Sequence, residues 1–208
     1  MKTFKGGPAP FKLADGSEIY IQDIVDNEQY STLEVHPGRV SDFAEVFDYA
    51  RGMVVPSSPI QRRAGNDDTT FIRPPTSGLP QAWEGHVFGW RASVEGPQAN
   101  DVAVRAWLAA TGATLTYRHK HYAVLPLSEL VRVPTPVIDP EGKPGNWPSI
   151  LNLKPGEITL PICLQENLEF GVRLYTEDTM VLAALATALT APIKVRVFLR
   201  GWWKRPVV

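Results

Sequence analysis

Two stretches in the last third of the chain alternate strictly between apolar and other residues. Residues 168–174 read Leu-Glu-Phe-Gly-Val-Arg-Leu, and residues 193–199 read Ile-Lys-Val-Arg-Val-Phe-Leu. Because successive side chains of a β-strand point to opposite faces, this period of two predicts two strands with one buried face each. We expect the two strands to form a pair that closes the fold.

The rest of the chain contains more strand patterns than helix patterns. Short β-branched and aromatic runs between turn residues predict strands at 17–25, 30–35, 53–55, 86–94, 114–124 and 158–164. Helical spacing of apolar residues marks 41–52, 100–110 and the segment from Thr176 to Pro192. The stretch from Val46 to Val55, which overlaps the first of these segments, also fits a strand, and we favour a short helix that leads into the strand at 53–55. The balance predicts an all-β fold with two or three short helices.

Proline and glycine punctuate the whole chain, with 19 prolines and 16 glycines. They separate many short elements, which is typical of a sandwich or a barrel. They are dense at 56–82 and 134–156, where we expect two long loops, the first of them touching a partner. Residues 1–16 are predicted to form an extended arm, and residues 17–208 a single domain.

Charge and composition narrow the classes of partner and location. The formal net charge of -1 gives the molecule no overall attraction to nucleic acid or anionic lipid. The single cysteine, Cys163, cannot form an intrachain disulfide, and its apolar context predicts a small buried thiol. The first residues lack the apolar run of a secretory signal, and the longest such run, Met180 to Leu189, is shorter than the ~20 residues that cross a bilayer. We expect a protein made in the cytoplasm, without a signal peptide or transmembrane segment.

Motifs for catalysis are absent from the sequence. It contains no nucleophile elbow, phosphate-binding loop or dinucleotide-binding glycine pattern, so we expect neither an enzyme nor a cofactor. One spacing keeps an alternative open, because His119 and His121 would share one face of a strand and could bind zinc or iron. Cupin enzymes begin their metal set in this way, but the other histidines, His36 and His86, lie upstream. A cupin-like metal-dependent enzyme or a sugar-binding jelly roll is therefore the alternative reading.

The end of the chain interleaves basic and aromatic residues. The basic residues are Lys194, Arg196, Arg200, Lys204 and Arg205, and the aromatic residues are Phe198, Trp202 and Trp203. A platform for single-stranded nucleic acid has this composition, and a nucleic-acid-binding accessory protein is a second alternative. The near-neutral net charge favours another interpretation, in which the basic residues guard an outer strand face and the tryptophans pack on the sheet or in a subunit contact.

The closing pattern resembles a known family. An alternating strand with Phe-Gly-Val-Arg-Leu, a short excursion, then Ile-Lys-Val-Arg-Val-Phe-Leu-Arg-Gly and a basic-aromatic end is similar to the C-terminal part of viral jelly-roll coat proteins. Coat proteins of icosahedral, membrane-containing bacteriophages are the closest kind. The resemblance covers residues 157–208.

This resemblance implies an antiparallel β-sandwich of jelly-roll type with about eight strands, acting as a self-assembling capsid subunit in the virion. Its main partner would be itself, and other capsid proteins or an underlying viral membrane are further candidates, with no sequence-specific nucleic acid. The residues expected at subunit contacts are Phe4, Phe11, Arg62, Arg63, Arg196, Phe198, Arg200, Trp202 and Trp203.

Overall fold

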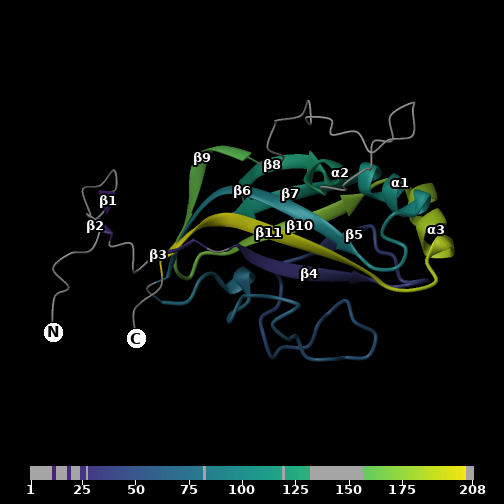
Figure 1. Ribbon diagram of the computed structural model, residues 1–208, viewed down its shortest axis with the longest axis horizontal. Coiled ribbons are helices and arrows are strands. Elements are labelled where there is room, and N and C mark those ends of the chain that lie inside the picture. The colour runs from purple at the N-terminus through teal and green to yellow at the C-terminus, as the bar shows by residue number, and fades with distance from the viewer. Residues whose placement is uncertain are drawn as a thin grey trace, which may run out of the picture.

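Two antiparallel sheets face each other in the computed structural model and enclose an apolar core (Figure 1). The structure describes residues 11–12, 18–19, 24–26, 28–81, 83–118, 120–131 and 157–204. The predicted all-β sandwich is confirmed.

The first sheet has β11 at its centre. Strand β11 (Ile193–Lys204) pairs along one side with β6 (Glu84–Glu95), and along the other side with β4 (Gln29–Val35) and then β3 (Ile24–Asp26). Strand β9 (Glu157–Leu164) adds to the free side of β6. The second sheet has the order β5 (Phe43–Glu45), β10 (Phe170–Thr176), β7 (Thr111–Tyr117) and β8 (Lys120–Pro126). A separate two-stranded sheet joins β1 (Phe11–Lys12) to β2 (Glu18–Ile19).

The eight strands from β4 to β11 pair in a nested order. Strand β4 pairs with β11, β5 with β10, β6 with β9, and β7 with β8, all antiparallel. Successive pairs alternate between the two sheets, which are completed by the contacts of β6 with β11 and of β7 with β10. The half of the chain from β4 to β7 therefore runs antiparallel to the half from β8 to β11. Each half contributes strands to both sheets.

Both alternating stretches bury the predicted faces. Ile193, Val195, Val197 and Leu199 of β11 are fully buried, as are Phe170, Val172 and Leu174 of β10. The predicted pairing of these two strands is wrong, because β10 lies in the second sheet and β11 in the first. Helix α3 (Thr179–Ala188) carries the chain from one sheet to the other, so the two strands contribute to the same core from opposite sides.

Three helices gather at one end of the sandwich (Figure 1). Helix α1 (Val102–Ala110) follows β6, α2 (Leu127–Leu130) follows β8, and α3 follows β10. The side chain of Asp101 accepts a hydrogen bond from the backbone N–H of Ala103 at the start of α1. Asp101 therefore caps this helix in place of the predicted Asn100. Asp178 caps α3 by accepting from the N–H groups of Met180 and Val181.

Two further predictions of local structure are wrong. Segment 41–52, read as a short helix, instead contains the edge strand β5, because its backbone pairs with β10. Segment 114–124, read as one strand, is a hairpin: β7 ends at Tyr117, Arg118 adopts a left-handed backbone conformation with φ 51°, and β8 begins at Lys120. Tertiary pairing decides both segments, because their local patterns fit more than one element.

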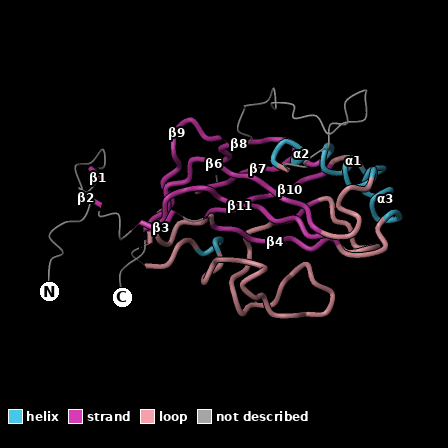
Figure 2. The backbone as a smooth tube through the Cα atoms, viewed as in Figure 1, coloured by secondary structure: helices cyan, strands magenta, loops and turns pink. Residues whose placement is uncertain are grey.

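The long connection from β5 to β6 is irregular, as predicted for 56–82, and runs below β4 of the first sheet in the view of Figure 2. It contains one 3-10 turn, η2 (Pro75–Ser77). Phe47, Phe71 and Leu79 insert from this connection into the core, where the Phe47 and Phe71 rings meet edge-on at 5.3 Å between centroids. The second predicted loop, 134–156, lies outside the described residues. No helix in the described ranges is long and apolar enough to span a membrane.

Candidate functional surfaces

The outer face of the first sheet contains the predicted basic and aromatic residues of β11. The Phe198 ring is covered by the Arg91 guanidinium, whose carbon lies 3.9 Å from the ring centroid, and by Tyr30, at 5.6 Å between ring centroids. Arg196 lies over the Tyr30 ring in the same way, at 5.0 Å. These cation–π contacts join β4, β6 and β11 on this face and leave Phe198 only partly exposed.

The charges on this face are largely compensated within the chain. Arg91 makes two hydrogen bonds to Glu28, of 2.9 and 2.5 Å, and these bonds hold the pKa of the Glu28 carboxyl below its ordinary value. Arg196 pairs with Glu95 at 3.1 Å, and Lys194 lies 3.9 Å from a Glu34 oxygen. With rings covered and charges paired, this face differs from an open stacking platform for single-stranded nucleic acid.

Trp202 and Trp203 lie on opposite sides of β11. Trp203 is 1% exposed and belongs to the core, so its predicted place in a subunit contact is wrong. Trp202 is 46% exposed and points outward, as does Arg200. A β-bulge between Arg200 and Gly201 shifts the register, and the period of two then continues to the end of the strand.

Arg62 forms an internal clamp between the long loop and β4. Its guanidinium donates two hydrogen bonds of 2.6 Å to the Asp68 carboxylate and a further one to Glu34. Burial alone would raise the pKa of Glu34, but hydrogen bonds from Arg62 and His36 outweigh it and lower that pKa. The bonds from Arg62 also lower the pKa of Asp68. Arg63 is exposed and donates to the Gly52 carbonyl at 3.1 Å.

The clamp predicts loss of stability in acid. Both carboxyls have a lower pKa in the folded chain than the value of about 4 expected when unfolded, so their contribution is present above about pH 4 and is lost as the pH falls through the lowered folded values. Urea unfolding of the wild type between neutral pH and about pH 3 should show this fall. The double variant Glu34→Gln/Asp68→Asn should show a shallower fall, and equal pH dependence would contradict the assignment.

Two of the other predicted contact residues have no described side chain. Phe4 and the predicted arm lie outside the described residues, apart from the backbone of β1. Phe11 is part of β1, where it pairs with Ile19. Arg205, in the basic tail, also lies outside the described residues.

The histidines of the predicted metal spacing do not share an uninterrupted strand. His119 falls between β7 and β8 and lies outside the described residues, whereas His121 is on β8 and is exposed. His121 lines a hollow of about 100 Å³ with Thr116 and Arg118. Of this pair the structure therefore describes only His121, which lies on the surface.

A larger hollow of about 250 Å³ lies beside the β4–β5 connection. Its lining includes Val35, Asp42, Asp48, Trp107 and Thr176. Burial raises the pKa of Asp48 above its ordinary value. The volume is below the ~300–1,000 Å³ of typical small-molecule sites. The hollow's described lining residues include carboxylates such as Asp42, Glu45 and Asp48, but no histidine, cysteine or lysine.

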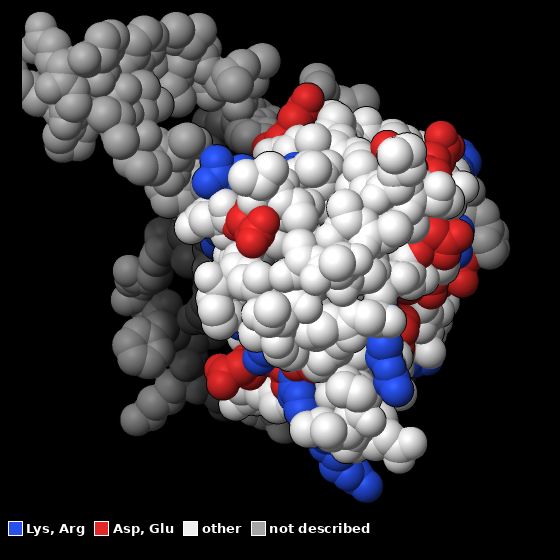
Figure 3. Space-filling model, turned by 90° about the vertical axis from the view of Figure 1, so that its right-hand side faces the viewer, with Lys and Arg blue, Asp and Glu red and all other residues white. Residues whose placement is uncertain are grey.

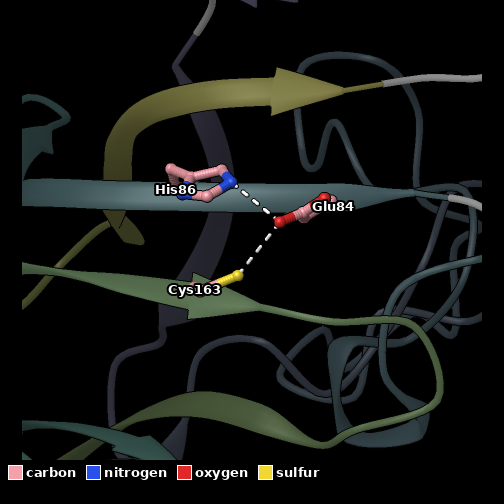
Figure 4. A group of neighbouring side chains, drawn as sticks. All are labelled: Glu84, His86 and Cys163. Carbon is pink, nitrogen blue, oxygen red and sulfur yellow. Dashed lines mark hydrogen bonds and ion pairs between the residues drawn. The ribbon is translucent and has the colours of Figure 1, made fainter. Parts of the chain in front are cut away.

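Glu84, His86 and Cys163 meet on the outer face of β6 and β9 (Figure 4). One carboxylate oxygen of Glu84, Oε1, lies 2.8 Å from His86 Nε2 and accepts from Cys163 Sγ at 3.2 Å. Burial and the adjacent carboxylate raise the pKa of the Cys163 thiol to about 11. Cys163 is partly buried and is not enclosed in the core. Because its pKa is raised, the thiol is protonated at neutral pH, which argues against a nucleophilic role.

The helical end of the sandwich presents an uncharged face. Seen from this end, the middle of the surface is free of Lys, Arg, Asp and Glu, which lie mostly toward its rim (Figure 3). The chain carries no charged residue from Thr179 to Ile193, and Arg105 is the only one in α1. The exposed residues of the two helices include Val102, Ala106, Ala109, Met180, Ala183 and Ala184. Val102 and Met180 are 79% and 81% exposed.

Comparison with models of known protein families and with curated proteins finds no match. The function must therefore be argued from these surfaces and from the strand order.

Sequence reasoning missed both the helical end and the three-residue cluster on β6 and β9. The apolar run from Met180 to Leu189 was considered only for its length, but the lack of charge from Thr179 to Ile193 on a surface helix is the informative signal. The cluster has no comparable signal, because Cys163 is far from Glu84 and His86 in sequence. Only the antiparallel pairing of β6 with β9 brings them together.

Proposed function

We propose that this protein is a self-assembling coat subunit of jelly-roll type, which acts through contacts between copies of itself. The strand order supports the fold, because a jelly roll is an eight-stranded double sheet of two Greek keys and the chain from β4 to β11 has eight nested strands. Viral capsid proteins, lectins and cupins all use this architecture, so the fold alone leaves the function open.

The filled interior favours a structural role over an enclosed ligand site. Phe47, Phe71, Phe170 and Trp203 pack edge-on against one another between the sheets, with centroid separations of 5.3 to 6.5 Å. Trp90 is also buried in this core. A cupin-like enzyme would need room for a substrate between the sheets, and the described side chains occupy that space.

The uncharged helical end is the observation that carries the proposal. An exposed helix that is apolar on most sides is normally covered, and large uncharged patches mark interaction sites. A second copy of this chain fits as the occupant, because two such faces can meet without bringing like charges together. The face is also held firmly: the Gln98 amide donates to the Ala188 carbonyl at 2.9 Å and accepts from the Thr190 N–H at 2.7 Å, which ties the β6–α1 connection to the end of α3.

Met180→Glu tests this surface. Met180 is 81% exposed, so the substitution should leave the fold intact, while a charge desolvated in the contact should weaken assembly about tenfold or more. Sedimentation velocity and light scattering over a range of concentrations would measure the fraction of assembled chains.

The comparison variant is Ile60→Glu, at a residue that is 76% exposed on the long loop, the other surface expected to touch a partner. It should assemble like the wild type if the helical end makes the contact, whereas weakened assembly would assign the contact to the loop. A wild type that stays monomeric at every concentration would overturn the coat proposal. Normal assembly of Met180→Glu would overturn the assignment of the helical end.

A further inference from the structure

We propose that Glu84, His86 and Cys163 form a binding site for Zn²⁺. The ligand atoms, one from each side chain, all lie within 4.8 Å of one another, and within the described part of the chain this is the one group of three such side chains close enough to hold a metal ion. The inference stands apart from the coat proposal, because it rests only on these three residues and the strands that hold them.

The sheet holds the three side chains in fixed relation. Glu84 and His86 are two residues apart on β6 and so share its outer face, and His86 is the direct register partner of Cys163 on β9. Strand β6 is interior to the sheet, with β11 on its other side. All three ligands therefore come from paired strands, which position a site more accurately than loops do.

Two glycines allow the close packing behind this site. A Cβ on Gly85, between the two β6 ligands, would lie 2.6 Å from the Trp203 ring. A Cβ on Gly201 would lie 2.4 Å from the His86 carbonyl oxygen. The backbone of β6 is thus held close against β11 around His86. The register shifts of β6 with β11 and with β9 both fall between Val87 and Gly89, at one end of this short segment.

The donor set selects the metal. A thiolate, an imidazole nitrogen and a carboxylate oxygen are the three kinds of ligand that zinc takes in proteins, whereas Ca²⁺ and Mg²⁺ take oxygen ligands. With metal–ligand bonds of about 2.0–2.3 Å, a tetrahedral site separates its ligand atoms by about 3.3–3.8 Å. The present separations from Glu84 Oε1 are 2.8 and 3.2 Å, and all the ligand atoms lie within 4.8 Å of one another, so small rotations of these partly exposed side chains would bring the set to tetrahedral spacing.

Zn²⁺ binding would replace the present hydrogen bond between Cys163 and Glu84. The Cys163 S–H now donates to Glu84, and on binding this proton leaves to solvent while the thiolate bonds to the metal. The described residues contribute no fourth histidine, cysteine or carboxylate to the group, so water can take the fourth position. The side chains of His86 and Glu84 are 23% and 29% exposed, which leaves a path for the ion from solvent.

Titration of the full-length, metal-free protein with Zn²⁺ and with Co²⁺ tests the site. We expect about one equivalent of either metal per chain and, with Co²⁺, a thiolate-to-cobalt charge-transfer absorption. Cys163 is the single cysteine, so this absorption reports only on the proposed site. Cys163→Ser should abolish the absorption, and His86→Asn and Glu84→Gln should each weaken Zn²⁺ binding by about tenfold or more.

The chain offers a matched control in His36 and Glu34, which make the same kind of pair two residues apart, at 3.1 Å, without a cysteine. His36→Asn should bind both metals like the wild type. Substoichiometric metal, cobalt bound without the thiolate absorption, or unchanged Zn²⁺ binding by Cys163→Ser would each overturn the proposal. Circular dichroism of every variant would confirm that a lost site is not a lost fold.

Discussion

Trp203→Ala should lower the free energy of unfolding by about 4 kcal/mol, because it removes a fully buried indole and leaves a cavity that the core cannot fill. The ring packs edge-on against Phe71 and lies directly over Gly85, so both sheets and the long loop contact it or its neighbours. A domain is stable by only about 5–15 kcal/mol, so this one substitution should remove a large part of the total. Equilibrium unfolding in urea would measure it.

Trp202→Ala is the control for that experiment. The two tryptophans are adjacent in sequence, but Trp202 lies on the outer face and is about half exposed. Its replacement should cost less than about 1 kcal/mol. Trp203→Phe should fall between the two, because it keeps most of the apolar contact and removes a buried indole N–H that has no partner within the described residues. Equal losses for the two alanine variants would contradict the burial of Trp203.

Arg62→Met should lower the free energy of unfolding by about 2–3 kcal/mol, because it removes the guanidinium that two buried carboxylates share. Glu34 is on β4 and Asp68 is on the long loop, so the variant should also loosen the loop from the sheet. Tyr49 supplies a second attachment, since its hydroxyl donates to the Thr32 carbonyl. Urea unfolding gives the energy, and hydrogen exchange of loop amides gives the local opening.

Arg63→Ala is the matched control, because Arg63 is exposed and makes its hydrogen bond to a carbonyl of the same loop. It should change stability by no more than about 0.5 kcal/mol. Adding Glu34→Gln and Asp68→Asn to Arg62→Met should recover part of the loss, because no unpaired buried charge then remains. A loss of the same size in Arg63→Ala would show that Arg62 is not a specific clamp.

Buried and exposed residues of this chain allow effects on folding to be distinguished from effects on assembly. Trp203 and Arg62 serve the fold of one chain, so a failure of their variants to assemble would say little about subunit contacts. Trp202, Arg63 and Met180 are exposed, and their variants can report on contacts without unfolding the chain. Subunit contacts should therefore be tested with variants of Trp202, Arg63 and Met180.

The two alternating stretches show what local pattern can predict. A strict period of two fixes which side chains of β10 and β11 are buried, because one face of each strand must leave water. The same pattern says nothing about which strand lies alongside. Pairing of β10 with β5 and β7, and of β11 with β4 and β6, depends on residues up to 170 positions apart in the chain, such as Gln29 and Leu199.

Pairing with adjacent strands decided the structure of short segments whose local pattern is ambiguous. Segment 41–52 has helical spacing, yet the backbone of β5 completes the free edge of β10 and gains hydrogen bonds there. The hairpin at Tyr117–Lys120 needs a residue in the left-handed backbone conformation, which Arg118 adopts. Arginine is not typical of such turns, so the sequence did not indicate one here. The predicted histidine spacing assumed one unbroken strand, and the turn at Arg118 interrupts that strand.

The sequence by itself determined the class of fold, the buried faces of its strands, two of its three helices and the irregular long loop, because these follow from side-chain period and from turn and capping residues. Tertiary structure decided which strands pair, which tryptophan is core, and which residues meet on the surface. The Glu84–His86–Cys163 cluster and the Arg62 clamp exist only because strands and loops distant in sequence are brought together, and the uncharged helical end exists because α1 and α3 pack against each other. Those contacts are non-local, and no periodicity within a single segment encodes them.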